Sequence, residues 1–342
     1  YNEEHKMARA ARPVASLIFQ TRCADHARSS GLHRDMREMI RWAEGKFSDM
    51  TAAEHHLSGD GFLSTPLDYA AMILGATETM KVSGCAVLAP LYKPLNLAER
   101  ITFLDLISNG RFRTVLALGY REQEYRAAGV DWQQRGKLFD ELLKKVMALL
   151  QGETIEINGQ ASQLHHLPDS PVNELVYVGG NSAPAARRAA RMDLPFWPSV
   201  EDADVLDAYH QACEKEGVTA RLQLSQFAGF EFIAEDPDKA WQEIGPYLLY
   251  DAMAYQAIGN SQRRSASEFT DADIDALRAS GTYNIITPKQ ALDRFEANQA
   301  LTINPLAGGI PTEQGWRCLE LYATKVLPHL DLDFRRFSSI PW

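Results

Sequence analysis

The chain has 342 residues, of which 45% are hydrophobic and 23% are charged. This composition is ordinary for a globular protein with a large core, and it excludes fibrous and low-complexity classes. The 45 acidic residues outnumber the 35 basic ones and give a formal net charge of −10. An acidic chain is a poor match for the nucleic-acid backbone, and no apolar run approaches the roughly 18 residues of a membrane-spanning helix. We therefore expect a soluble protein that binds neither nucleic acid nor membrane.

The four cysteines, Cys23, Cys85, Cys213 and Cys318, are far apart and form none of the short CxxC spacings of metal or redox sites. We expect reduced thiols, a cytoplasmic location and no metal centre. Residues 1–12 are polar and basic and lack the apolar region of a secretory signal, so we interpret them as a disordered leader or an expression remnant outside the fold.

Short apolar runs alternate with helical patterns along the rest of the chain. The first run, at 14–20, lies between Pro13 and polar residues, which predicts a buried strand. A helix is predicted at 32–44, where apolar residues recur at helical spacing. Seven further strand and helix pairs are predicted at 47–53 and 66–79, 82–88 and 96–107, 113–118 and 132–150, 175–178 and 183–191, 194–197 and 204–216, 222–233 and 236–257, and 283–286 and 288–297.

Eight strand-then-helix units predict the α/β class, because parallel strands need helical crossovers. We expect an eight-stranded parallel β/α (TIM) barrel with insertions, formed by residues 13–342 as a single domain; an open doubly wound sheet is the alternative. Turn-forming residues at 152–173 predict a small inserted hairpin or excursion. The polar stretch 259–280 precedes the expected eighth strand and is either a lid over the barrel or a solvated excursion.

Glu54, His55 and His56 directly follow the second predicted strand, at the end where barrel enzymes hold their catalytic groups. One histidine should face the barrel mouth and the other should pack against the wall. A mouth histidine can act as a general acid, a general base or a hydrogen-bond donor, whereas the alternatives are a satisfied loop histidine or a metal ligand. No second cluster of acidic residues and histidines lies nearby, which argues against a metal.

Gly179, Gly180, Asn181 and Ser182 follow the fifth predicted strand and open a helix. Glycines let the backbone approach a ligand, and the amides and hydroxyl at a helix start favour an anion such as phosphate. The same residues also suit an ordinary turn with Ser182 as the helix cap.

Ala117, Leu118, Gly119 and Tyr120 end the fourth predicted strand. A small residue, a glycine and an aromatic residue could line a flat ring system, or Gly119 could only permit a turn. The motifs of dinucleotide folds, P-loops, serine hydrolases and zinc proteases are all missing from the sequence.

Taken together, these segments resemble the bacterial luciferase-like flavin-dependent monooxygenase family, in the family's order and across almost the whole chain. The segments that carry the likeness are AAEHHLSGDGF at 52–62, LAPLYKPLNLAERITFLDLISNGRF at 88–112, ALGYREQEYRAAGVDWQQR at 117–135, VGGNSAPAARRAAR at 178–191 and PLAGGIPTEQGWRCLELYATKVLP at 305–328.

The resemblance implies a β/α barrel that binds FMN at the carboxyl ends of its strands. It implies an active-site histidine at His55, with Glu54 and His56 beside it. The residues that would bind the cofactor are a non-prolyl cis peptide at Cys85–Ala86, the strand end Ala117, Leu118, Gly119 and Tyr120, and a phosphate site formed by Arg135, Gly179, Gly180, Asn181 and Ser182.

The chain departs from luciferase itself at several of these positions. Leu118 stands where luciferase has an arginine, Ala117 where it has a reactive cysteine, Asn181 where it has an acidic residue, and Lys93 where it has another histidine. These departures are compatible with FMN binding but argue against long-chain aldehyde oxidation and light emission.

The function that the resemblance implies is a two-component monooxygenase. Reduced FMN, supplied by a separate reductase, would react with O₂ to form a flavin hydroperoxide that oxygenates a small organic substrate. The alternatives are hydride transfer with a deazaflavin coenzyme on the same fold, and a flavin-binding relative without catalytic activity. The resemblance also implies a homodimer that pairs through the helices near the second and third strands.

Overall fold

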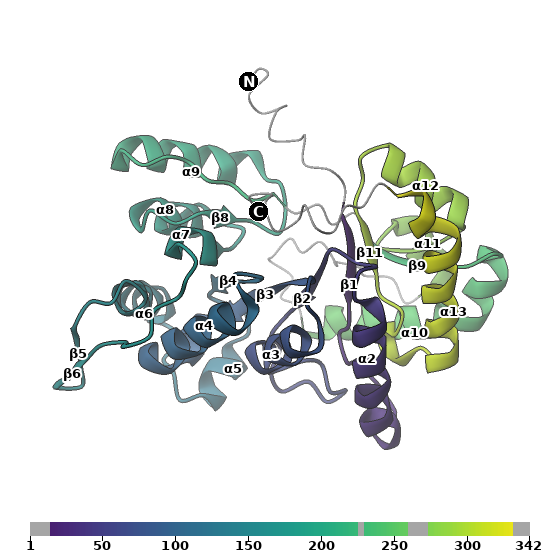
Figure 1. Cartoon of the computed structure of the whole chain (residues 1–342), viewed down its shortest axis with the longest axis horizontal. Coiled ribbons are helices and arrows are strands. Elements are labelled where there is room, and N and C mark those ends of the chain that lie inside the picture. Colours follow the sequence, from purple (N-terminus) through teal and green to yellow (C-terminus); the bar gives the residue numbers. More distant parts are fainter. Residues whose placement is uncertain (1–13, 225–228, 259–272, 331–342) are drawn as a thin grey trace.

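A sheet of parallel strands crosses the middle of the molecule, and helices pack around it (Figure 1). The structure, a computed structural model, describes residues 14–224, 229–258 and 273–330. The strands of the main sheet are β1 (Ala15–Ile18), β2 (Asp49–Ala52), β3 (Lys81–Leu88), β4 (Phe112–Ala117), β7 (Val176–Gly179), β8 (Phe196–Trp197), β9 (Phe230–Ile233), β10 (Tyr283–Ile286) and β11 (Leu301–Ile303).

The α-helices follow the strands along the chain. They are α2 (Ser29–Ala43), α3 (Pro66–Ala76), α4 (Pro94–Ser108), α5 (Glu122–Ala127), α6 (Arg135–Leu150), α7 (Val172–Leu175), α8 (Ala183–Arg191), α9 (Ala203–Glu216), α10 (Pro237–Ile258), α11 (Ile274–Ser280), α12 (Pro288–Glu296) and α13 (Thr312–Leu321). Within the described residues, no helix is both long enough and apolar enough to span a membrane.

The strand order is β10-β9-β11-β1-β2-β3-β4-β7-β8, and every neighbouring pair in this sheet is parallel. The predicted α/β architecture of parallel strands and helical crossovers is therefore confirmed. Beyond β8, Leu222 forms a parallel bridge with Phe196. No pairing in the described part of the chain joins this end of the sheet to β10, so the predicted barrel stays open at one seam.

The last two predicted strands need correction. The predicted strand at 222–233 is not continuous: Leu222 pairs with β8, whereas β9 pairs with β10 and β11. The strand predicted as the eighth, β10, lies at an end of the sheet and does not contact the first strand. Its expected place beside β1 is taken by β11, where Leu301 pairs with Ala15. β11 has only three residues, too few for a strand pattern to be recognised in the sequence.

The two inserted segments differ in structure. The segment at 152–173 contains the expected hairpin, with β5 (Ile155–Ile157) antiparallel to β6 (Gln160–Ser162), at the periphery of the molecule (Figure 1). Of the predicted loop at 259–280, residues 259–272 lie outside the described residues, and so do residues 1–12. The remainder of that loop is helix α11, because Asp273 caps it and Leu277 is buried.

A buried carboxylate ties the inserted segment to the barrel. Asp105 on α4 is fully buried, and its two carboxylate oxygens accept hydrogen bonds from the backbone N (2.9 Å) and the hydroxyl (2.6 Å) of Ser170. The backbone carbonyl of Asp105 accepts a hydrogen bond from Asn109, whose left-handed backbone ends α4. Asp105 therefore joins the end of α4 to the segment that leads into β7.

Replacing Asp105 by alanine should lower the free energy of unfolding by about 2 kcal/mol, because the half-buried amide and hydroxyl of Ser170 would both lose their acceptor. Urea denaturation followed by circular dichroism measures this change. The control is Glu313→Ala, which removes an exposed ion pair with Arg317 and should change stability by less than about 0.5 kcal/mol. Equal effects of the two substitutions would contradict the anchoring role of Asp105.

Candidate functional site

The carboxyl ends of neighbouring parallel strands lie at one edge of the sheet, and the residues after β1, β2, β3, β4 and β7 form the candidate site there. Parallel pairing in register is what brings these five chain segments together. Most of the residues predicted from sequence lie directly at this edge.

Glu54 is buried and joins the end of β2 to the end of β3. Its Oε2 accepts a hydrogen bond from the backbone N of Leu88 (2.6 Å), and its Oε1 accepts one from the hydroxyl of Tyr92 (2.9 Å). The same Oε1 lies 2.7 Å from Nε2 of His56. A buried carboxylate with three partners acts as an anchor, so the geometry gives Glu54 a positioning role.

His56 is fixed to the wall of the site on both its side chain and its backbone. The hydrogen bond to Glu54 raises the pKa of its imidazole. Its backbone N donates to Oε1 of Glu124 (2.9 Å), and its carbonyl oxygen accepts from Arg121, which also pairs with Glu124 at 3.0 Å. The sequence predicted that one histidine of the pair would pack against the wall, and His56 has this arrangement.

His55 lies in an aromatic cluster. Its ring stacks on Phe62 with the centroids 4.2 Å apart and the planes 14° apart. The rings of Tyr255 and Tyr120 approach it edge-on, with centroids at 5.9 and 6.2 Å. Among the described residues, neither ring nitrogen of His55 has a hydrogen-bond partner. Both nitrogens are therefore available to a bound molecule.

The surroundings of His55 keep its ring neutral. Burial is the main cause that lowers the pKa of His55 to about 3, and the positive charges of Arg22 and Arg121 lower it further. A neutral imidazole carries one nitrogen that donates and one that accepts. At neutral pH, His55 can therefore donate a proton to one atom and accept one from another.

The end of β3 bulges into the site. The peptide bond between Cys85 and Ala86 is cis, as the family resemblance predicted. The register between β3 and β4 shifts at this point, since Cys85 is opposite Val115 and Val87 is opposite Leu116. Burial raises the pKa of the Cys85 thiol to about 11, so it is a neutral group rather than a nucleophile.

The residues after β4 pack closely against the neighbouring strands. Gly119 has a φ of +69°, and a Cβ there would meet the side chain of Leu88 at 2.9 Å. The carbonyl of Leu118 accepts a hydrogen bond from the hydroxyl of Tyr125, which fixes the turn. A residue with a side chain would not fit at Gly119, so this glycine permits both the turn and the close approach of β3.

The turn after β7 leads into α8, and the first residues of this helix lack a side-chain cap. A Cβ at Gly179 would lie 2.6 Å from Val115 and 3.5 Å from Ala117, which places this turn against the end of β4. Ser182 is the first cap residue of α8, and its hydroxyl makes no capping hydrogen bond. The side chain of Asn181 exchanges hydrogen bonds with Ser199 (2.6 and 2.8 Å) and ties the turn to the segment after β8.

Arg135 begins α6, next to α8. Its guanidinium lies 3.9 Å above the ring of Trp132 and donates to the carbonyl of that residue at 2.9 Å. The carbonyl of the following residue, Gly136, accepts from Arg188 of α8 at 3.4 Å. The start of α6 is thus linked to the last turn of α8, which contains Arg188.

These features fit the phosphate group of a flavin nucleotide. A serine hydroxyl without a capping hydrogen bond and the amides of the first turn of α8 are donors of the kind that binds phosphate monoesters, and an arginine such as Arg135 can add the positive charge. The turn packs closely against the first turn of α8, since a Cβ at Gly180 would come within 2.8 Å of Ala185. In the ranges that the structure describes, no group of three or more His, Cys, Asp or Glu side chains is arranged to hold a metal ion.

Sequence reasoning missed the residues that surround His55. Arg22, Asp60 and Phe62 adjoin it from the chain segments after β1 and β2, and Asp251 and Tyr255 come from α10. Polar residues directly after the first predicted strand were a usable signal for Arg22. No sequence signal pointed to Asp251 and Tyr255, because a single side chain on a long helix cannot be related to a distant loop without the tertiary structure.

This chain is similar to curated proteins in sequence and to solved structures in fold. The alkanal monooxygenase alpha chain of Photorhabdus luminescens is 27% identical over 172 residues, which cover 46% of this chain and 48% of that protein. The chain thus spans about half the length of this curated relative. Among solved structures, the oxygenating constituent of 3,6-diketocamphane monooxygenase from Pseudomonas putida, a type II Baeyer–Villiger monooxygenase in complex with FMN, has a TM-score of 0.69 at 17% identity, over 94% of this chain and 99% of its own.

A second solved structure is an F420-dependent secondary alcohol dehydrogenase, with a TM-score of 0.60 at 14% identity, over 93% of this chain and 100% of its own. Both structural likenesses concern the fold. The family described as luciferase-like monooxygenase matches residues 15–304, which include every strand of the main sheet. With this match, the chain belongs to the luciferase-like monooxygenase family.

Proposed function

We propose that this chain is the oxygenating component of a two-component FMN-dependent monooxygenase. It would take reduced FMN from a separate flavin reductase and use O₂ to oxygenate a small organic substrate. The observation that carries this proposal is His55: a neutral imidazole with both nitrogens available, in an aromatic cluster at the carboxyl edge of a parallel sheet.

The phosphate of FMN would be bound at the start of α8. Ser182 and the amides of the first helical turn would donate to its oxygens, and Arg135 would supply the positive charge. Gly179 and Gly180 have no side chains, so the phosphate could approach the backbone of the turn closely. The bulged end of β3 at Cys85–Ala86 and the end of β4 from Ala117 to Tyr120 would then border the flavin ring.

Reduced FMN, when bound, supplies the two electrons with which O₂ is split, so that one oxygen atom enters the substrate and the other leaves as water. His55 holds or moves a proton at its ring nitrogens beside the reacting oxygens. Phe62, Tyr120 and Tyr255 form an apolar wall around the imidazole and exclude water from it. Glu54 and His56 keep the backbone at His55 in place.

One comparison favours a second candidate function. The F420-dependent alcohol dehydrogenase has the same fold, so hydride transfer from a deazaflavin without O₂ is the alternative. The decisive experiment uses the protein with chemically reduced FMN and ¹⁸O₂ on a panel of small ketones, alkenes and aromatic compounds. One ¹⁸O atom in the product supports oxygenation. Substrate reduction under nitrogen with reduced F420, together with no FMN binding, would overturn it.

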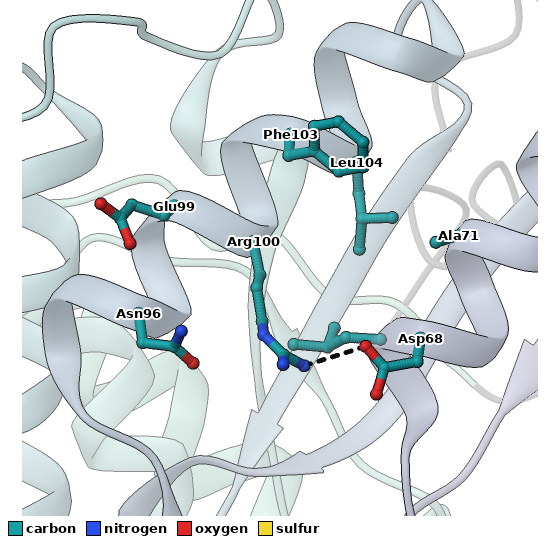
Figure 2. A pocket seen from close by; sticks show the side chains of 8 residues that line it. Asp68, Ala71, Asn96, Glu99, Arg100, Phe103 and Leu104 are labelled. Carbon is teal, nitrogen blue, oxygen red and sulfur yellow. Dashed lines mark hydrogen bonds and ion pairs between the residues drawn. The ribbon is translucent and has the colours of Figure 1, made fainter.

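A homodimer is part of the proposal. A groove of about 280 Å³ lies between α3 and α4, the helices that follow β2 and β3, and Figure 2 shows Arg100 reaching across it to Asp68. These two side chains pair at 3.2 Å. On α4, the side chains of Phe103 and Ile107 are 57% and 42% exposed. An apolar ridge beside charges of both signs suits pairing with a second copy of the same face.

Replacing His55 by alanine should leave FMN affinity within about twofold, because the imidazole is remote from the phosphate donors. Product formed per O₂ consumed should fall about 100-fold, because the proton donor and acceptor is lost. Hydrogen peroxide should appear instead. His165→Ala, an exposed histidine near the inserted hairpin, is the control. An unchanged product yield would remove His55 from the reaction.

Replacing Ser182 by alanine should weaken FMN binding about tenfold, because a hydrogen bond to a charged group is lost. Riboflavin, which lacks the phosphate, should bind both proteins equally. Fluorescence titration with the two flavins measures the difference, and Ser162→Ala, in strand β6 of the peripheral hairpin, serves as the control. A loss of riboflavin affinity equal to that of FMN would argue against a phosphate site at this helix.

Replacing Phe103 by glutamate should convert the dimer to a monomer, because a buried charge would lie at the centre of the interface. Sedimentation velocity measures the oligomeric state. Leu167→Glu changes another exposed apolar residue, 42% exposed and outside α3 and α4, and should leave the dimer intact. A monomeric unaltered protein would contradict the dimer.

A further inference from the structure

An arginine with no assigned role lies fully buried beside His55. Arg22 follows β1, and its side chain is 0% exposed. Its Nη1 donates to Oδ2 of Asp60 at 3.0 Å, and its Nε lies 3.4 Å from Oδ1 of Asp251 on α10. The guanidinium carbon is 4.1 Å from the centroid of Phe62 and 4.6 Å from that of Tyr255.

The same two rings contact His55. Phe62 stacks on the imidazole at 4.2 Å, and Tyr255 approaches it edge-on at 5.9 Å. The hydroxyl of Tyr255 in turn hydrogen-bonds the side chain of Gln20 at 3.2 Å. Phe62 and Tyr255 thus contact both the Arg22 guanidinium and the His55 ring, so a shift of the guanidinium would also shift the ring.

Stability alone does not account for a buried cation at this place. Taking a guanidinium out of water is costly even with ion partners, and apolar residues of the same volume often stabilise a protein as well or better. Nε and Nη2 of Arg22 have no hydrogen-bond partner among the residues that the structure describes, so the desolvation of the group is only partly offset. A role in the chemistry of the neighbouring site would explain why the charge is present.

We propose that Arg22 is a positioning residue: its guanidinium holds Phe62 and Tyr255 against the ring of His55 and places a positive charge beside that ring. This inference rests on the proposed function of His55. Asp60 and Asp251 hold the guanidinium in place from the loop after β2 and from α10. Arg22 does not itself contact the reacting atoms.

The charges around His55 agree with this role. Burial, Arg22, Arg121 and His56 all lower the pKa of His55, and Asp60 raises it. The other groups that face the ring, Tyr120 and Tyr255, are phenols, and burial raises the pKa of Tyr255 further. Without Arg22, the carboxylate of Asp60 would lose its cationic partner, and its negative charge would favour a protonated imidazole. Burial already raises the pKa of Asp251 to about 6, so this carboxyl group would take up a proton more readily without Arg22.

The test compares the unaltered chain with Arg22→Met and Arg22→Lys. In an NMR titration of ring-labelled histidine without flavin, the His55 signal, identified by its loss in His55→Gln, should titrate near pH 3 or not at all in the unaltered chain. It should titrate above pH 5 in Arg22→Met and stay below pH 5 in Arg22→Lys, which retains the charge. Arg126→Met, an exposed arginine of α5, is the control.

With FMN and a flavin reductase, product formed per O₂ consumed at pH 6 should fall about tenfold in Arg22→Met and recover partly as the pH rises to 8. A merely structural loss would be independent of pH. If Arg22→Met does not fold, the double variant Arg22→Met with Asp60→Asn removes the unpaired carboxylate, and His55 should still titrate at a higher pH than in Asp60→Asn alone.

An unmoved His55 titration in the folded variants would overturn the inference. The titration needs no flavin, so it separates this inference from the proposed function. A moved titration in a protein that never oxygenates a substrate would support the role of Arg22 and contradict the monooxygenase.

Discussion

The buried carboxylate of Glu54 is the contact on which the arrangement of the site depends. It connects the end of β2 with the backbone of β3 at Leu88, and it holds the ring of His56 at 2.7 Å. These contacts fix the backbone on both sides of His55. The His55 side chain therefore points into the aromatic cluster, where it stacks on Phe62. Without this carboxylate, the amide of Leu88 would be left buried without a partner, which costs about 1–3 kcal/mol.

Around this anchor, the site separates two kinds of polar group. His56, Glu124 and Arg121 satisfy one another along the wall. His55 keeps two available nitrogens and is surrounded by aromatic rings. The hydrogen bond to Glu54 raises the pKa of His56, whereas burial and the positive charges of Arg22 and Arg121 lower the pKa of His55. Neighbours in sequence thus take different roles because their surroundings differ.

Much of the fold follows from local patterns. The runs that became β1 to β4 and the helical stripes of α2, α3, α4 and α6 lie within a few residues of their predicted places, because each buries a long apolar face. The last strands of the sheet, β10 and β11, could not be placed from local patterns. β11 has three residues, and it is a strand only because Leu301 and Ile303 pair with β1. The segment predicted as the eighth strand, β10, pairs with β9 instead, and sequence patterns contain no information on the choice of partner.

The sequence by itself determined the parallel α/β architecture, the positions of the strand ends and the chemical groups at those ends, including the Glu54–His56 run and the glycines before Ser182. Periodicity and turn chemistry are local properties, so they can be read from neighbouring residues. Only the tertiary structure decided which histidine faces the aromatic cluster, and it alone brought Arg22, Asp60 and Asp251 together beside His55. Arg22 and Asp251 are more than two hundred positions apart along the chain. Their contact depends on how β1, the loop after β2 and helix α10 pack, which no local pattern specifies.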